Sequence, residues 1–250
     1  MTLQAFFIEQ PEVAVAFSGG ADSAYLLWAA MRYARRVRAY YVRSPFQPAF
    51  ELEDARRLAS ELGADMRVLH VDVLALPNVR ENPPDRCYHC KRALFSAILE
   101  ASAADRFPLL ADGTNASDDM GDRPGMRALK ELSVRSPLRE CGLQKAEIRR
   151  LSKKAGLFTW DKPAYACLAT RIPAGEAITR EALRKTEEAE DYLHSLGFSG
   201  FRVRLLADCA RLQLPAGQIP LLLARREEIF EELRQHYGGV LLDLEARDGQ

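Results

Sequence analysis

Hydrophobic and polar positions alternate in blocks along the first two thirds of the chain. Short apolar runs, the first at residues 13–17, have the length and β-branched content of buried strands. Longer stretches between them repeat apolar residues every three to four positions, as amphipathic helices do. The pattern predicts strands at 13–17, 37–42, 67–71 and 108–111, and helices at 22–35, 51–62, 86–101, 125–132 and 145–155.

This alternation predicts an α/β domain with a doubly wound parallel sheet, because parallel strands need right-handed helical crossovers. Residues 158–175 break the pattern with two prolines and a glycine. Helices at 180–195 and 218–236 and strands at 201–206, 209–214 and 240–244 then predict a small α+β unit. We therefore expect a nucleotide-binding domain at 1–160, an active-site loop and linker at 161–178, and a small α+β domain for substrate binding or oligomerisation at 179–250.

The first predicted strand runs directly into Ser18-Gly-Gly-Ala-Asp-Ser23 and a helix start. Gly19 and Gly20 allow consecutive backbone amides to close around an anion, and the helix N-terminus points its unpaired amides at the same place. Ser18 and Ser23 add hydroxyl donors, and Asp22 suits Mg²⁺ or a pocket amide. The lysine of a Walker loop is missing. An ordinary strand-turn-helix corner is the structural alternative.

A second polar segment, Asp112-Gly-Thr-Asn-Ala-Ser-Asp-Asp119, follows the fourth predicted strand. Its short oxygen side chains, with Gly113 and Thr114 among the first residues, suit Mg²⁺, ribose or the adenine edge. The same composition is typical of an Asx-rich turn. Ligands of doubly wound sheets bind beyond the carboxyl ends of the strands, so Ser18 and Asp112 are expected to face one crevice.

Three cysteines stand in positions that suit chemistry. Cys87 and Cys90 lie one turn apart at a predicted helix start, where thiolates are favoured, and Asp85 is a candidate cap. Packing in the apolar stripe of that helix is the alternative for both. Cys167 lies in a loop of small residues beside Arg171, whose guanidinium suits a thiolate or a developing oxyanion. A buried structural thiol is the alternative there, and Cys141 and Cys209 are interpreted as structural.

Composition narrows the class of protein. The 250 residues are 48% hydrophobic, and 35 basic residues balance 35 acidic ones, so no global field attracts nucleic acid or an anionic membrane. The sequence shows neither a membrane-spanning apolar stretch nor a signal peptide, which predicts a cytoplasmic protein. Five cysteines without a signal peptide argue against a disulfide framework.

The hexapeptide at 18–23 resembles the loop of the PP-loop ATP pyrophosphatases, which cleave ATP between the α and β phosphates. Together with NPPDRCYHCK at 82–91, DGTNASD at 112–118 and CLATRIPAGEAIT at 167–179, it looks like the LarE family of ATP-dependent sulfur transferases. The resemblance implies adenylation of a pyridinium bis-carboxylic acid mononucleotide and sulfur delivery to give a thiocarboxylate. In that family the product becomes the nickel-pincer nucleotide cofactor of lactate racemase and related enzymes.

The resemblance also implies residue roles. Ser18, Gly19, Gly20, Asp22 and Ser23 match the pyrophosphate loop, and Cys167 matches the sulfur-bearing cysteine. Some members sacrifice the sulfur of that cysteine. Others pair it with CxxC to hold a [4Fe-4S] cluster whose open iron carries a sulfide, and Cys87, Cys90 and Cys167 match this type.

The remaining expectations concern the substrate and the partners. Arg202 and Arg204 alternate on a predicted strand, so they share one face and suit the substrate phosphate, although a solvated basic face is the alternative. ATP, Mg²⁺, the cluster and a sulfide or other sulfur donor complete the expected set. The family resemblance also suggests a homo-oligomer.

Three other functions compete with sulfur transfer to a mononucleotide. An amide ligase of the NAD or GMP synthetase type shares the loop but gives the thiols no role. A tRNA thiolase is expected to show a basic face or an RNA-binding domain. A nucleotide-binding regulator is expected to bind ATP without releasing pyrophosphate.

Overall fold

The computed structural model describes residues 1–118, 124–163 and 165–247. The chain divides into two compact units, one of residues 1–73 and 85–162 and the other of residues 74–84 and 163–250. Each unit has its own sheet and its own hydrophobic core. No described helix combines the length and the hydropathy needed to cross a lipid bilayer.

The first unit contains the strands β1 (Glu12–Ala16), β2 (Arg36–Arg43), β3 (Met66–His70) and β4 (Leu110–Ala111). Its helices are α1 (Leu3–Glu9), α2 (Ala21–Tyr33), α3 (Ala49–Leu62), α5 (Arg86–Ala104), α6 (Pro124–Glu131), α7 (Pro137–Glu140), α8 (Lys145–Lys154) and the short η2 (Phe158–Asp161). The short η1 (Val73–Ala75) lies where the two units meet along the chain.

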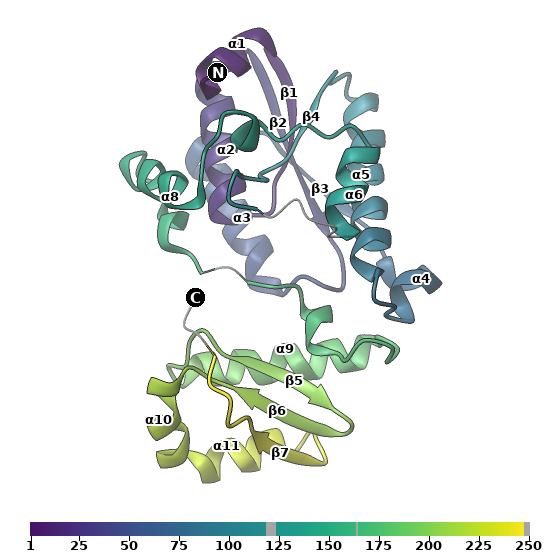
Figure 1. Ribbon diagram of the computed structural model, residues 1–250, viewed down its shortest axis with the longest axis vertical. Coiled ribbons are helices and arrows are strands. Elements are labelled where there is room, and N and C mark those ends of the chain that lie inside the picture. The colour runs from purple at the N-terminus through teal and green to yellow at the C-terminus, as the bar shows by residue number, and fades with distance from the viewer. Residues whose placement is uncertain (119–123, 164, 248–250) are drawn as a thin grey trace. The chain divides into compact units, whose positions relative to one another are not determined.

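The four strands form a parallel sheet in the order β3-β2-β1-β4. Helices cover both of its faces (Figure 1). Alternate residues of β1 enter different cores: Val13 and Val15 pack with α1, α2 and α3, whereas Ala14 packs with α5. The predicted doubly wound α/β sheet is therefore confirmed.

The order of the strands reverses at β1 and β4. From β1 the chain adds β2 and β3 on one side, and β4 then pairs with β1 on the other side. Such a reversal separates the loops at the carboxyl ends of the two neighbouring strands, and ligands of this fold bind there. The segments after Ala16 and Ala111 both leave the sheet at this point.

The second unit is a small α+β structure. Its elements are α4 (Pro77–Arg80), η3 (Leu168–Arg171), α9 (Arg180–Ser195), β5 (Arg202–Leu206), β6 (Cys209–Gln213), η4 (Ala216–Gln218), α10 (Ile219–Ala224), α11 (Arg226–Leu233) and β7 (Gly239–Leu242). Strands β5 and β6 pair antiparallel and β6 and β7 pair parallel. Leu193, Val203, Leu212 and Leu233 join α9, the sheet and α11 in one core.

Several elements differ from the sequence prediction, and the short helices α4 and α7 were among those not expected. Helix α1 was not expected, although Thr2 caps it by accepting from the Ala5 amide and Phe6 and Phe7 are buried. The helix expected at 218–236 is two helices separated at Arg225. Arg225 donates to the Leu196 carbonyl, which fixes the break against the end of α9.

Candidate active site

The glycine loop, residues Ser18–Ser23, joins β1 to α2 as a compact turn. Gly19 has a φ of +74°, and a Cβ there would lie 3.2 Å from the Cβ of Ala55 on α3, so glycine is needed for both conformation and space. The Ser18 amide donates to Ser23 Oγ at 3.3 Å, and the Gly20 amide donates to Ser18 Oγ at 3.4 Å. Each of these two backbone amides thus donates to a serine hydroxyl, and the two hydroxyls lie 3.0 Å apart.

The acidic loop, residues 112–118, lies directly against the start of α2. A Cβ on Gly113 would lie 2.9 Å from the backbone nitrogen of Ser23 and 3.0 Å from its Cα, so only glycine allows this approach. Thr114 is buried and its hydroxyl donates to Asp112, which also accepts from Ser136 Oγ at 2.7 Å. The loop is therefore an Asx-rich turn that also contacts the glycine loop. Asp119 of the expected segment lies outside the described residues.

Asp22 is the carboxylate that the two loops share. Burial raises its pKa above the ordinary range, and nearby Asp118 raises it further, while Lys145 and a hydrogen bond from Asn115 act in the opposite direction. Its Oδ1 is buried and has no hydrogen-bond partner within the part of the chain that the structure describes. A buried carboxylate oxygen without a donor is suited to a cation, and hard oxygen ligands are those that Mg²⁺ prefers.

A lysine that the sequence analysis did not select lies at the glycine loop. Lys162 Nζ pairs with Asp54 Oδ2 at 2.6 Å and donates to the Gly19 carbonyl at 3.4 Å. In sequence it is 143 residues from Gly19, in a segment that shows no spacing or motif linking it to the loop.

Cys87 and Cys90 occupy the first turn of α5 as expected. Cys87 is exposed and does not belong to the core beneath α5, so packing does not explain it. Arg86 donates to its Sγ at 3.7 Å, which places a cation beside the sulfur. Asp85 precedes the helix but makes no side-chain cap; its carboxylate pairs with His89 instead. Among the described residues, no group of three or more His, Cys, Asp or Glu side chains is arranged to hold a metal ion.

Cys167 belongs to the second unit, where it precedes η3 and is half-buried. Its carbonyl accepts from the Thr170 amide at 2.9 Å and from the Thr170 hydroxyl at 2.8 Å. The Arg171 guanidinium donates to the Ala166 carbonyl at 3.0 Å and to Thr170 Oγ1 at 2.8 Å. Arg171 thus fixes the backbone around the thiol, while the expected effect of its charge on the sulfur remains a prediction. Ala164, which begins the expected loop, lies outside the described residues.

Arg171 is neutralised by a buried carboxylate on α9. Its Nε and Nη2 donate to Glu190 at 2.7 and 2.9 Å, and the two side chains are 0% and 2% exposed. Tyr165 and the Val203 amide donate to the same carboxylate. Burial and the charge of Glu190 both raise the pKa of Tyr165. Glu190 therefore ties the Cys167 segment to α9 and β5, and sequence reasoning did not find it because its partners are distant in sequence.

Arg202 and Arg204 lie on β5 near this pair. Arg204 donates to the Thr170 carbonyl at 2.7 Å and to Gln213, and the Arg202 guanidinium lies 5.4 Å from the centre of the Tyr165 ring. Burial lowers the pKa of both arginines, and the charge of Arg171 lowers it further. Such mutual repulsion marks an excess of positive charge, which a phosphate would relieve.

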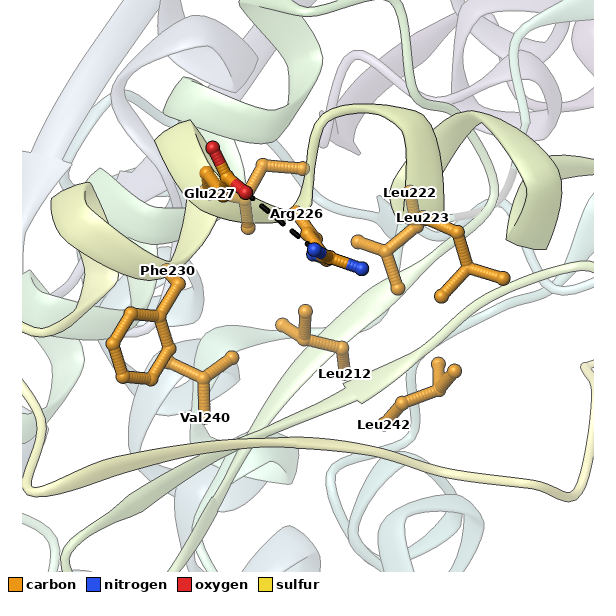
Figure 2. A pocket seen from close by; sticks show the side chains of 9 residues that line it. Leu212, Leu222, Leu223, Arg226, Glu227, Phe230, Val240 and Leu242 are labelled. Carbon is orange, nitrogen blue, oxygen red and sulfur yellow. Dashed lines mark hydrogen bonds and ion pairs between the residues drawn. The ribbon is translucent and has the colours of Figure 1, made fainter.

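An apolar pocket of about 330 Å³ opens between α10, α11 and the sheet of the second unit. Figure 2 shows Leu212, Val240 and Leu242 on its floor and the exposed ion pair of Arg226 with Glu227 at its rim. Phe230, which also lines it, is 51% exposed. The pocket holds none of the residues expected to bind ATP, sulfur or phosphate.

Several known proteins are similar to this chain in sequence. The chain is 38% identical to an uncharacterized protein of Synechocystis sp. over 98% of this chain and 92% of the relative. It is 33% identical to the pyridinium-3,5-bisthiocarboxylic acid mononucleotide synthase of Lactiplantibacillus plantarum, over 97% of this chain and 89% of that enzyme. The tRNA-specific 2-thiouridylase MnmA of Thermotoga petrophila is 24% identical over 48% of this chain and 40% of its own. No protein-family model matches the chain.

Proposed function

Because this chain belongs to the LarE family of ATP-dependent sulfur transferases, we propose that it converts a carboxylate of a pyridinium bis-carboxylic acid mononucleotide into a thiocarboxylate. A carboxylate oxygen attacks the α-phosphorus of ATP, and pyrophosphate leaves. Sulfide then attacks the acyl adenylate, and AMP leaves. Both relatives with named activities form carbon-sulfur bonds by their printed names.

The observation that carries the ATP half of the proposal is the contact between the glycine loop and the acidic loop. Ser18, Gly19, Gly20 and Ser23 present amides and hydroxyls where the α2 dipole favours negative charge. Gly113 brings the acidic loop onto the same helix start. In this proposal the glycine loop holds the β and γ phosphates, and Gly113 and Thr114 adjoin the nucleoside.

Mg²⁺ fits the buried oxygen of Asp22 that has no donor among the described residues. When bound, the ion neutralises phosphate charge and assists departure of pyrophosphate. Asp22 contributes an anionic ligand for it, and Asn115 orients the carboxylate by a hydrogen bond.

The sulfur half of the proposal rests on thiols. Cys87, Cys90 and Cys167 supply the donor set that a [4Fe-4S] cluster with one open iron requires, and such an iron can carry a transferable sulfide. The exposure of Cys87 and the cation at its sulfur support ligation over core packing. The competing proposal is that Cys167 gives up its own sulfur and becomes dehydroalanine.

Arg202 and Arg204 are proposed to bind the phosphate of the mononucleotide. In addition to burial, the charge of Arg171 lowers the pKa of both arginines more than the charge of Glu190 raises it, and this excess of positive charge supports the role. Residues 179–250 would then form the substrate-binding domain.

Self-association is proposed for the same domain. Its apolar pocket and the half-exposed Phe230 support burial against a second copy of the chain. Light scattering of the purified protein measures this: a mass of one chain across the accessible concentrations would remove the proposal.

The test of the function is anaerobic reconstitution with iron and sulfide, followed by turnover with ATP and the pyridinium substrate. Cluster absorption and released pyrophosphate are measured for Cys87→Ala, Cys90→Ala and Cys167→Ala. Cys141→Ala is the matched control, since burial raises the pKa of this thiol and the proposal gives it no role.

We expect each of the three variants to lose the cluster and the thiocarboxylate, while Cys141→Ala keeps both. Absence of pyrophosphate with the wild-type protein would contradict sulfur transfer by adenylation. If the protein formed normal product without a cluster and Cys167 lost one sulfur and two hydrogens, the result would favour transfer of the sulfur of Cys167 itself over transfer from a cluster.

A further inference from the structure

The glycine loop contains no basic residue, yet a lysine from a distant segment contacts it. Lys162 follows η2, and its side chain is only 15% exposed. Its Nζ lies 2.6 Å from Asp54 Oδ2 and 3.4 Å from the Gly19 carbonyl oxygen. Arg149 of α8 donates to the Lys162 carbonyl at 3.0 Å, so the backbone of this residue is held as well. These contacts fix the position of the Lys162 ammonium group.

Helix α3 supports the same point of the loop. Ala55 lies where a Cβ on Gly19 would reach it at 3.2 Å, and Asp54, the preceding residue of α3, holds the ammonium. The Gly19 peptide is therefore confined by Ala55 through packing, and its carbonyl also accepts a long hydrogen bond from the charged Lys162.

The contact between Lys162 and the Gly19 carbonyl affects the direction in which the Gly20 N–H points. In a trans peptide the carbonyl and the following N–H point in opposite directions. A donor on the Gly19 carbonyl therefore turns the Gly20 N–H away from Lys162. Within the described part of the chain, this N–H donates to Ser18 Oγ at a long 3.4 Å, so it is available to an anion.

We propose that Lys162 is a positioning residue that fixes the Gly19–Gly20 peptide so that the Gly20 N–H points at the pyrophosphate of ATP, and that Asp54 holds Lys162 in place. The proposal rests on the proposed function, since it assumes that the loop binds pyrophosphate.

Binding of inorganic pyrophosphate with Mg²⁺, measured by calorimetry, tests this role without sulfur transfer. We expect Lys162→Met to weaken binding about tenfold, because an unfixed donor loses much of a charge-assisted hydrogen bond. Asp54→Asn should weaken it less, and Lys162→Arg should restore most of it. Lys154→Met, which removes an exposed lysine of α8, is the matched control.

A spectroscopic readout separates positioning from stability. The Gly20 amide resonance of ¹⁵N-labelled protein should shift in Lys162→Met and return toward its wild-type position in Lys162→Arg. If Lys162→Met fails to fold, Asp54→Asn and Lys162→Arg decide by the same two measurements.

Unchanged pyrophosphate affinity and an unchanged Gly20 resonance in the Lys162 and Asp54 variants would overturn the role of Lys162 and leave the proposed function standing. If the wild-type protein binds neither ATP nor pyrophosphate, the proposed function and this inference both fail. Weaker binding with a shifted resonance, rescued by arginine, supports the inference.

Discussion

The two regions expected to handle the substrates are built on opposite principles. The glycine loop and the acidic loop use backbone amides and short side chains, and their shared carboxylate Asp22 keeps a buried oxygen without a donor among the described residues. The cluster around Arg171 uses long charged side chains, and its central pair with Glu190 is fully buried and closely hydrogen-bonded. The first region keeps a buried polar atom without a donor among the described residues, whereas the buried pair of the second region is fully hydrogen-bonded.

This difference predicts opposite responses to mutation. Groups left without partners lower the stability of the ligand-free protein, so removing them should stabilise it and abolish function. Groups in a satisfied buried pair support the fold, so removing one partner leaves the other charge buried and alone.

The largest effect is expected for Glu190→Gln. Loss of this carboxylate leaves the buried guanidinium of Arg171 without its counter-charge, which should cost about 3–5 kcal/mol of unfolding free energy. Thermal and denaturant unfolding measure this. The control is Glu188→Gln on the same helix, whose exposed pair with Arg184 is worth at most about 1 kcal/mol. Equal stabilities of the two variants would show that the buried pair of Arg171 and Glu190 does not support the fold more than an exposed pair does.

Gly113→Ala probes the close approach of the acidic loop. Its Cβ would meet the Ser23 backbone at 2.9 Å, and forcing the loop away should cost about 1–3 kcal/mol and weaken ATP binding. Gly217→Ala is the matched control, because its Cβ meets no atom within 4 Å and its φ is not positive. Calorimetric ATP binding that is equal in both variants would show that the two loops need not touch.

Arg204→Lys tests the arginines of β5. Lysine keeps the charge but loses the forked geometry, so the KM for the mononucleotide should rise about tenfold while the KM for ATP stays constant. Steady-state kinetics with each substrate varied in turn give the two values. Arg226→Lys at the rim of the apolar pocket serves as the control. If only the KM for ATP rose, the proposal that β5 binds the phosphate of the mononucleotide would be contradicted.

Asp22→Asn should have the smallest effect on stability. It should raise stability, whereas Glu190→Gln and Gly113→Ala should lower it. Because burial raises the folded pKa of Asp22, the folded state holds a proton more tightly, and stability falls as pH rises through that pKa. At neutral pH the amide should therefore raise the melting temperature by about 2–4 °C, or about 1 kcal/mol. Pyrophosphate release should be lost. The interpretation would be contradicted if Asp22→Asn melted below the wild-type protein at pH 7, and if the difference in melting temperature between variant and wild type were no more favourable at pH 7 than at pH 4.

The sequence predicted the first region well because its contacts are local. The strand, the two glycines and the helix start follow one another at 13–23, and β4 delivers the acidic loop to the same edge by the rule for parallel sheets. The need for glycine at Gly113 was not visible, because it depends on the backbone of Ser23.

The second region was predicted only in part, since its contacts join distant positions. Arg171 was selected for its place beside Cys167, but its partner Glu190 lies 19 residues away on α9 and reads in sequence as an ordinary helix carboxylate. The first region has one such distant contact as well, and Lys162 was missed there because it lies 143 residues from Gly19. Helix α1 and the break at Arg225 were also missed, because short helices at chain ends and turns have little periodicity to detect.

In the proposed reaction, ATP activation at the glycine loop is coupled to repeated sulfur delivery through Cys87, Cys90 and Cys167. The most direct measurement counts pyrophosphate and thiocarboxylate per protein chain during anaerobic turnover of the reconstituted protein with sulfide, and then weighs the peptide containing Cys167. We expect several thiocarboxylates per chain, one pyrophosphate for each, and an unchanged mass at Cys167. A single product per chain with conversion of Cys167 to dehydroalanine would contradict it.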